Sequence, residues 1–288
     1  MACPRYHDGM LRHIVLATAL CGCGLFPDLD VLTGNEAGSP VDASIDATKD
    51  VTPDVVVVET GSDATPDVSD AAVCTCSNLV SAYTFSNTSK LGHDYFGNNE
   101  FTTVKGAPGQ STKVPPGFSG YSLQLDGTST VCIDSGYTFD STNDHTLCWW
   151  SQPTALSDST NQFAQTCSYD TWTTSAGVDY LWRINNCNSG TAANLQVANV
   201  YAVNQWVQIC QTYKKSSMTR TVIIGGNTSQ KHVIVDTVPI VENTSSWCIG
   251  SYGTGGWWTG LIFRPMWFDR VLSDSEIQAV AAQGCCLP

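Results

Sequence analysis

Tryptophan is the residue type in this chain whose placement most directly suggests binding chemistry. Two adjacent pairs, Trp149-Trp150 and Trp257-Trp258, are among its nine tryptophans. Because successive side chains of a β-strand point to opposite faces, we expect one member of each pair to face outward. Exposed indole rings beside Asn, Asp or Gln side chains are typical of sites that stack against sugar rings. The pairs therefore suggest a carbohydrate site.

Two further tryptophans, Trp172 and Trp182, lie in the segment 167–187 and could line a groove. The alternative is that they fill the interior, because large aromatic side chains dominate the cores of folded domains. We take Trp150, Trp172, Trp182 and Trp257 as candidate ligand-binding residues and keep the core alternative open.

Residues for hydrolysis are sparse. Beyond residue 73 the chain has three glutamates, Glu100, Glu242 and Glu276, and they are far apart in the sequence. The serine-hydrolase motif G-x-S-x-G and the zinc-protease motif H-E-x-x-H are absent from the sequence. We expect no catalytic residues, with a divergent glycoside hydrolase as the alternative.

Cysteine is abundant, with thirteen residues. Cys3, Cys21 and Cys23 belong to the N-terminal segment described below. Ten remain, an even number that in an exported chain predicts five disulfides. Metal thiolates are the rival reading, but these ten include no C-x-x-C pair and only three histidines follow residue 73. The ten are Cys74, Cys76, Cys132, Cys148, Cys167, Cys187, Cys210, Cys248, Cys285 and Cys286.

The N-terminal segment 1–23 predicts export. A basic start at Arg12 and His13 precedes a short apolar run that is too short to cross a membrane stably. The run ends in Leu20-Cys21-Gly22-Cys23, which resembles the bacterial lipobox, so Cys23 is the expected lipidated residue. An ordinary secretory signal cut near Cys23 is the alternative, and either Met1 or Met10 is the start. The multiply acylated cysteine that this resemblance implies would hold the protein firmly in a membrane.

The segment 24–73 carries most of the negative charge. It holds eleven acidic residues and one basic residue, Lys49, whereas residues 74–288 hold fourteen acidic and ten basic residues. A segment so acidic and poor in aromatic residues cannot bury enough surface to offset its chain entropy. We expect a disordered spacer. No Lys/Arg cluster that could bind phosphates is present in the sequence, so nucleic acid is not an expected partner.

From residue 74 onward, turn residues separate short runs of strand-forming residues. We expect strands at 79–85, 121–127, 130–134, 145–152, 162–169, 179–186, 204–214, 219–226 and 231–238. A final apolar run, 261–271, should be a strand covered on both faces. Ser273 and Glu276 then form a predicted capping box for a short helix over 277–282. Many short strands with one closing helix favour an all-β sandwich.

Five of these runs occur in the order of a known family. GYSLQLDGTSTVCI, HTLCWW, NQWVQICQTYK, TVIIGG and WCIGSYGTGGWWTGLIFRPMWFDRVLSDSEI together resemble a laminin G-like domain of the concanavalin A-like lectin/glucanase group. The resemblance covers about residues 79–282. It implies a jelly-roll sandwich of two antiparallel sheets, stapled by disulfides, that serves as a binding or adhesion module. It also implies that Trp258 packs in the core, which leaves Trp257 as the exposed member of its pair.

The resemblance bears on calcium and on enzymes of the group. Asp94 and Asn98 resemble a turn whose oxygens hold Ca²⁺ in relatives, while Phe263 and Arg264 stand where the final strand of relatives carries carboxylates. An Asx-rich turn without metal is the alternative at Asp94. The paired glutamates of the glucanases, in an E-x-D-x-x-E pattern, are missing here.

The same family layout suggests disulfide pairings. Cys167 and Cys187 bracket two neighbouring strands and could pair across them. Two more bridges are expected where the termini of a jelly roll meet, between Cys74/Cys76 at one end and Cys285/Cys286 at the other. Cys148 with Cys210 and Cys132 with Cys248 are the pairings that strand position suggests. Each bridge closes a long loop and would contribute about 4 kcal/mol in the chain-entropy model.

The sequence thus predicts an exported lipoprotein of the bacterial cell envelope, at the cell surface, the outer membrane or the periplasm. Its parts are a signal peptide (1–23), a spacer (24–73) and one laminin G-like domain (74–288). Its expected function is to bind a glycan or adhesion ligand without catalysis. A surface protein as partner, or a structural role with no glycan site, is the alternative.

Overall fold

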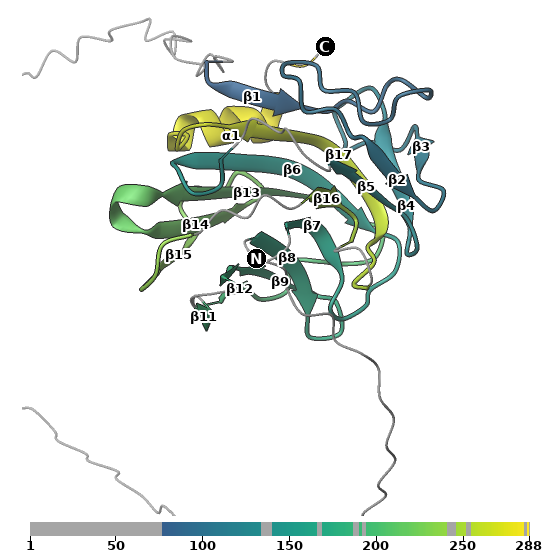
Figure 1. Cartoon of the computed structure of the whole chain (residues 1–288). Coiled ribbons are helices and arrows are strands. Elements are labelled where there is room, and N and C mark those ends of the chain that lie inside the picture. The colour runs from purple at the N-terminus through teal and green to yellow at the C-terminus, as the bar shows by residue number, and fades with distance from the viewer. Residues whose placement is uncertain are drawn as a thin grey trace, which may run out of the picture. The chain divides into compact units, whose positions relative to one another are not determined.

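The computed structural model describes residues 77–133, 140–165, 169–186, 190–191, 194–240, 246–251, 255–284 and 287. These residues lie in one compact unit of the chain. Figure 1 shows two facing β-sheets and one helix. The all-β sandwich with one C-terminal helix is confirmed. None of the helices in this part of the chain is long and apolar enough to cross a membrane.

The larger sheet has eight strands in the order β15-β14-β13-β6-β17-β4-β3, and β1 pairs with the end of β17. All of its pairings are antiparallel. Its strands are β1 (Leu79–Ala82), β3 (Gly109–Ser111), β4 (Ser122–Asp126), β6 (His145–Pro153), β13 (Val207–Lys214), β14 (Thr219–Ile224), β15 (Lys231–Val235) and β17 (Thr259–Phe268).

The smaller sheet has seven strands in the order β12-β9-β8-β7-β16-β5-β2, also antiparallel. Its strands are β2 (Thr103–Lys105), β5 (Thr130–Ile133), β7 (Asn161–Gln165), β8 (Tyr169–Thr174), β9 (Asp179–Arg183), β12 (Leu195–Val197) and β16 (Trp247–Ile249). A separate two-stranded pair joins β10 (Asn185–Asn186) and β11 (Gly190–Thr191).

The expected strand at 162–169 is wrong in its bounds. The chain forms two paired strands there, β7 and β8, with a register shift between Asn161 and Ala164. A bulge of this kind puts an extra residue on one strand, so a plain alternation pattern cannot locate it. Phe163 and Gln162 both face the interior at this point: Phe163 packs on Trp149, and Gln162 accepts a hydrogen bond from the indole nitrogen of Trp149.

The main core fills the space between the two sheets. It is rich in aromatic side chains, and Trp149, Tyr180, Trp182 and Trp258 are all buried there. One buried ion pair lies among them. The Arg220 guanidinium donates to both carboxylate oxygens of Asp236 at 2.7 Å and to the Trp182 carbonyl at 2.9 Å. This bidentate geometry offsets the cost of removing both charges from water.

A second apolar layer lies on the other face of the eight-stranded sheet, beneath helix α1 (Asp274–Gln283). Alternate residues of β17 supply both layers: Ile262 and Trp267 face the main core, while Phe263 and Phe268 face this second layer. The predicted strand with two covered faces is confirmed. So is the capping box, in which the Ser273 side chain accepts from the Glu276 amide and the Glu276 side chain from the Ser273 amide.

Two disulfides join directly opposite residues of paired strands. Cys148 on β6 bonds Cys210 on β13, and Cys132 on β5 bonds Cys248 on β16. Both pairings were predicted and are confirmed. The other six predicted disulfide cysteines, with the signal peptide, Cys23 and the spacer, lie outside the described residues.

Candidate functional site

The outer face of the seven-stranded sheet brings two of the candidate tryptophans together. Trp172 on β8 stands directly opposite Asn161 on β7, and Trp257 forms a parallel bridge with Asn161 from the other side. Directly paired residues of neighbouring strands share one face of a sheet. The neighbours of this set, Trp258 and Gln162, point into the core instead. Trp172, Asn161 and Trp257 therefore form a row on the outer face, which we call the tryptophan row.

Asn161 is the polar centre of this row, and the sequence did not single it out. Its side chain is fully buried, and neither amide atom has a hydrogen-bond partner among the described residues. A buried amide without a partner costs about 1 to 3 kcal/mol. Because Asn161 has no exposed surface, the parts of the row open to a ligand are Trp172 and Trp257.

Gly256 lets the chain approach Asn161 closely. The Asn161 amide donates to the Gly256 carbonyl at 2.7 Å, and a Cβ at Gly256 would lie 2.7 Å from the Asn161 side-chain nitrogen. The backbone of Gly256 has a φ of +67°, which favours glycine. This glycine therefore sets how near Trp257 lies to Asn161.

Arg183 adds a fixed cation beside the row. Its guanidinium lies 4.5 Å above the Trp172 ring, and its Nε and Nη2 donate to Asp170 Oδ2 at 3.3 and 2.8 Å. Burial raises the pKa of the Asp170 carboxyl, and the bonds from Arg183 oppose that rise. The planar cation is thereby held on one face of the indole, and its charge is compensated by the neighbouring carboxylate.

Two predicted ligand-binding residues are wrong. Trp150 is only 4% exposed, because Phe118 and Phe263 pack against its ring at 5.0 and 5.9 Å in the layer under α1. Trp182 is completely buried in the main core beneath Arg220. Neither ring can stack on a ligand. Trp172 and Trp257 are both partly exposed, and Trp258 is buried as the resemblance implied.

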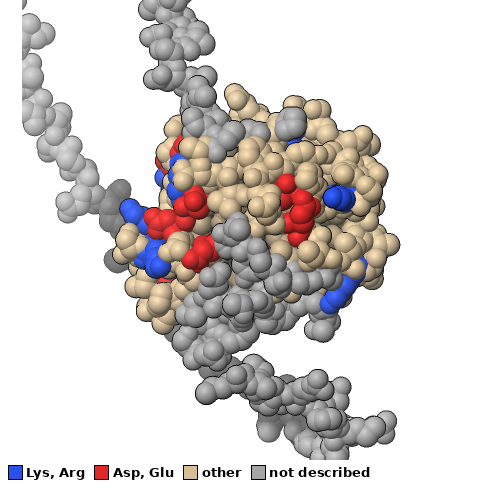
Figure 2. All heavy atoms as spheres, turned by 45° about the horizontal axis from the view of Figure 1, so that its top comes forward, with Lys and Arg blue, Asp and Glu red and all other residues tan. Residues whose placement is uncertain are grey.

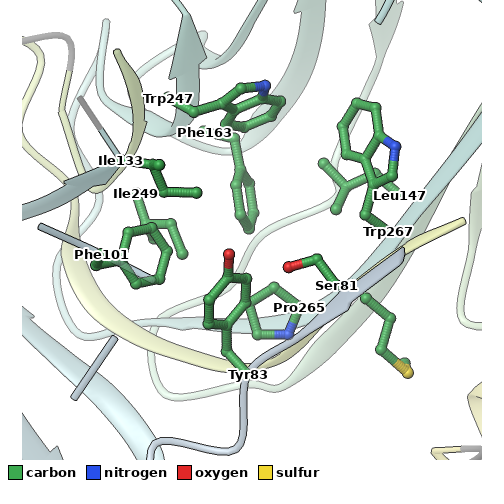
Figure 3. Close-up of a pocket in the computed structure, with 11 residues that line it drawn as sticks. Ser81, Tyr83, Phe101, Ile133, Leu147, Phe163, Trp247, Ile249, Pro265 and Trp267 are labelled. Carbon is green, nitrogen blue, oxygen red and sulfur yellow. The ribbon is translucent and has the colours of Figure 1, made fainter. Parts of the chain in front are cut away.

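The cavity between the sheets is too small to be the binding site. Its volume is about 30 Å³, and Figure 3 shows Ser81 and Tyr83 pointing their hydroxyl groups into a space otherwise lined by apolar side chains such as Phe163 and Trp247. Ligand pockets span about 300 to 1,000 Å³, whereas a single water needs only about 10 to 15 Å³. This cavity therefore cannot hold a sugar ring.

This architecture agrees with that of a known protein superfamily. The family model described as the concanavalin A-like lectin/glucanases superfamily matches residues 125–278, more than half of the chain. The chain belongs to this superfamily. The matched range runs from β4 into α1 and includes all of the tryptophan row.

Solved structures of the superfamily fold give the same picture. Domain 4 of the extracellular arabinanase AbnA from Geobacillus stearothermophilus, in complex with arabinotriose, aligns with a TM-score of 0.55 at 17% identity, over 71% of this chain and 98% of that one. The binding domain of Paraclostridial Mosquitocidal Protein 1 aligns with a TM-score of 0.55 at 14% identity, over 71% of this chain. The botulinum neurotoxin serotype D binding domain also scores 0.55, at 11% identity over 71% of this chain.

The chain spans about half of the toxin domains, 52% and 51% of their lengths. At these identities the likeness establishes the fold alone. No curated protein matches the chain in sequence. These structural neighbours are two toxin binding domains and domain 4 of an extracellular arabinanase.

The turn predicted to hold calcium in this superfamily member uses its carboxylate locally. Asp94 Oδ1 accepts from the backbone amides of Ala82 and Phe96 at 2.9 and 3.1 Å, and Oδ2 accepts from the Asn99 amide at 3.1 Å. Asp94 is buried, whereas Asn98 is exposed. No group of three His, Cys, Asp or Glu side chains that could hold a metal occurs among the described residues. Calcium binding stays a prediction.

The described glutamates have structural partners. Glu100 lies 2.6 Å from His93 Nδ1, and Glu276 accepts from the guanidinium of Arg270 at 2.5 and 2.8 Å. The bond from Arg270 and the bonds from Ser273 lower the pKa of Glu276 to about 2. An acid catalyst needs a raised pKa, so Glu276 is unsuited to that role. Glu242 lies outside the described residues.

Proposed function

We propose that this chain is a non-catalytic glycan-binding module of a bacterial cell envelope, attached to the membrane by a lipid on Cys23. The observation that carries the proposal is the tryptophan row, in which Trp172 and Trp257 lie on either side of Asn161 on one face. Partly exposed indoles supply apolar surface on which sugar rings can stack. The arabinotriose complex of the AbnA domain supports this use of the fold.

The direct test is binding of the purified chain 24–288 to a panel of polysaccharides, repeated with Trp257→Ala. We expect at least one polysaccharide to bind and Trp257→Ala to lose that binding. Trp206→Ala is the matched control, because Trp206 is also a partly exposed tryptophan but packs near Phe263 at the other sheet. No binding to any member of the panel would overturn the proposal.

The lipid anchor has its own test. The lipobox at 20–23 supports acylation of Cys23. We expect the wild-type protein, expressed in a bacterium with labelled palmitate, to carry the label and to sediment with membranes. Cys23→Ala should lose both properties. Label on the variant, or an unlabelled wild type, would contradict the anchor.

A protein partner is the second candidate, and one surface favours it. Tyr95, Phe96 and Val104 are exposed large hydrophobic residues of the segment 89–104. Leu91, Phe101 and Val104 line a groove of about 350 Å³ there. Exposed apolar groups beside a groove are typical of protein contacts. Figure 2 shows that the Lys, Arg, Asp and Glu side chains of the described residues lie in small separate groups on the face in view.

A further inference from the structure

The tryptophan row continues across the sheet in strict register. Trp172 stands opposite Leu181 on β9, and Leu181 stands opposite Gln196 on β12. The residues on either side of Leu181, Tyr180 and Trp182, are buried in the main core, so Leu181 faces outward.

Gln196 faces outward by the same alternation, because Leu195 and Val197 on either side of it are buried in the core. The extended row is therefore Gln196, Leu181, Trp172, Asn161 and Trp257, one residue from each of five adjacent backbone segments.

The length of the extended row sets the size of its ligand. Neighbouring strands lie about 4.8 Å apart, so Trp172 and Trp257 are separated by about 10 Å and the whole row by about 19 Å. One sugar ring cannot stack on both indoles at that separation. A ligand that uses the row must be a chain of several sugars, and it must run across the strands rather than along them.

The chemistry of the row indicates an uncharged ligand. All five side chains are neutral. The cation beside the row, Arg183, is ion-paired to Asp170, with Nη2 2.8 Å from Oδ2. The exposed and partly exposed members of the row are one amide, Gln196, and three apolar side chains, Leu181, Trp172 and Trp257. Apolar side chains with a neutral amide suit the apolar ring faces and hydroxyl groups of a neutral sugar polymer.

Gln196 at the far end is already held in position. Its amide nitrogen donates to Thr174 Oγ1 at 3.2 Å and to Asp179 Oδ2 at 2.9 Å. Hydrogen bonds from the Asn199 amide, Ser175 and Gln196 hold the pKa of the Asp179 carboxyl below its usual range, so it stays an ionised acceptor. A side chain fixed before binding loses little conformational entropy when a ligand arrives.

We propose that the outer face of the seven-stranded sheet is an extended track for a neutral, linear oligosaccharide, with Trp257 and Trp172 as inner stacking positions and Gln196 as the distal contact. The inference rests on the proposed glycan-binding function and adds the class, length and direction of the ligand. Longer chains gain contacts at Leu181 and Gln196 that short ones cannot reach.

Calorimetry with two ladders of sugars tests this track: arabinose to arabinohexaose and glucose to cellohexaose, titrated into chain 24–288. For the ladder that binds, we expect the hexasaccharide to bind at least about a hundredfold more tightly than the monosaccharide, a difference of about 2.7 kcal/mol. Oligogalacturonates, which are acidic, should bind more weakly than neutral chains of equal length. A monosaccharide that binds as tightly as the hexasaccharide would overturn the track but leave glycan binding intact.

Two glutamine variants separate the track from a compact site. Gln196→Ala should weaken hexasaccharide binding about threefold to tenfold, as expected for one lost hydrogen bond, and leave disaccharide binding unchanged. Gln124→Ala, an exposed glutamine on β4 of the other sheet, should change neither. Unfolding temperatures of both variants verify that they fold. If the Gln196→Ala variant and the wild type bound the hexasaccharide with equal affinity, Gln196 would not be a contact of the ligand. No binding in either ladder would overturn the proposed function and the track with it.

Discussion

The two sheets carry aromatic residues on their outer faces, and these residues differ in their exposure. On the eight-stranded sheet, Phe118 and helix α1 bury Trp150 and Phe263 in a second apolar layer. On the seven-stranded sheet, Trp172 and Trp257 are partly exposed on either side of the buried Asn161. The same residue type on the outside of a strand thus serves stability on one face and is available for binding on the other.

The disulfides give the largest expected effect, and each sheet carries one on its outer face. Cys148–Cys210 and Cys132–Cys248 enclose 62 and 116 residues. In the chain-entropy model the double variant Cys148→Ala/Cys210→Ala should lose about 4 kcal/mol of unfolding free energy, and Cys132→Ala/Cys248→Ala about 5 kcal/mol. Urea unfolding measures both. A loss below 1 kcal/mol for either pair would show that its strands are held by other contacts.

Trp150→Ala tests the covered face. Removing a buried tryptophan costs about 3 to 5 kcal/mol, because its partners Phe118 and Phe263 are left beside a cavity. Thermal and urea unfolding should show this loss, while the folded variant keeps its glycan affinity at low temperature. If stability were unchanged and binding lost, the assignment of the two faces would be reversed.

Asp94→Asn tests a turn that belongs to neither face. Its carboxylate accepts three backbone hydrogen bonds, so the variant should lose about 1 to 3 kcal/mol. The same variant tests the predicted calcium site, through the unfolding temperatures of wild type and variant in CaCl₂ and in EDTA. A calcium-dependent rise in the wild type that Asp94→Asn abolishes would place the ion at this turn.

We expect acid to lower the stability of the protein through helix α1, which covers the outer face of the eight-stranded sheet. The pKa of Glu276 is lowered from 4.5 to about 2. The stabilisation of the folded state by ionised Glu276 is therefore fully present above pH 4.5 and is lost as the pH falls toward 2. The unfolding temperature should fall over this window, and Glu276→Gln should flatten that part of the profile. Asp126, with its pKa also near 2, contributes to the same decline, so Asp126→Asn is the comparison variant. An unaltered profile for Glu276→Gln would contradict the role of the cap.

The sequence predicted features that depend on neighbouring residues or on strand order. The capping box at Ser273 and Glu276 is local, and the pairing of Cys148 with Cys210 follows from the order of long strands. It did not predict which outward tryptophan is covered. Trp150 is covered by Phe118, which lies in a loop distant from it in the sequence.

The sequence also did not predict the position of Asn161 in the row. Asn161 meets Trp257 only because the chain returns to pair with β7 after crossing both sheets. The bulge in β7 then decides that Asn161 faces outward while Gln162 and Phe163 face inward. Alternation alone does not reveal a bulge, so the row became visible only in three dimensions.

The most direct measurement is the glycan affinity of Trp257→Ala compared with its stability. Trp257 is partly exposed, so its removal should change the unfolding free energy by less than about 1 kcal/mol. Calorimetry against the best-binding oligosaccharide should nevertheless show an affinity at least about tenfold lower, a loss of 1.4 kcal/mol or more. An unchanged affinity in a folded Trp257→Ala protein would contradict the claim that the outer face of the seven-stranded sheet binds glycans.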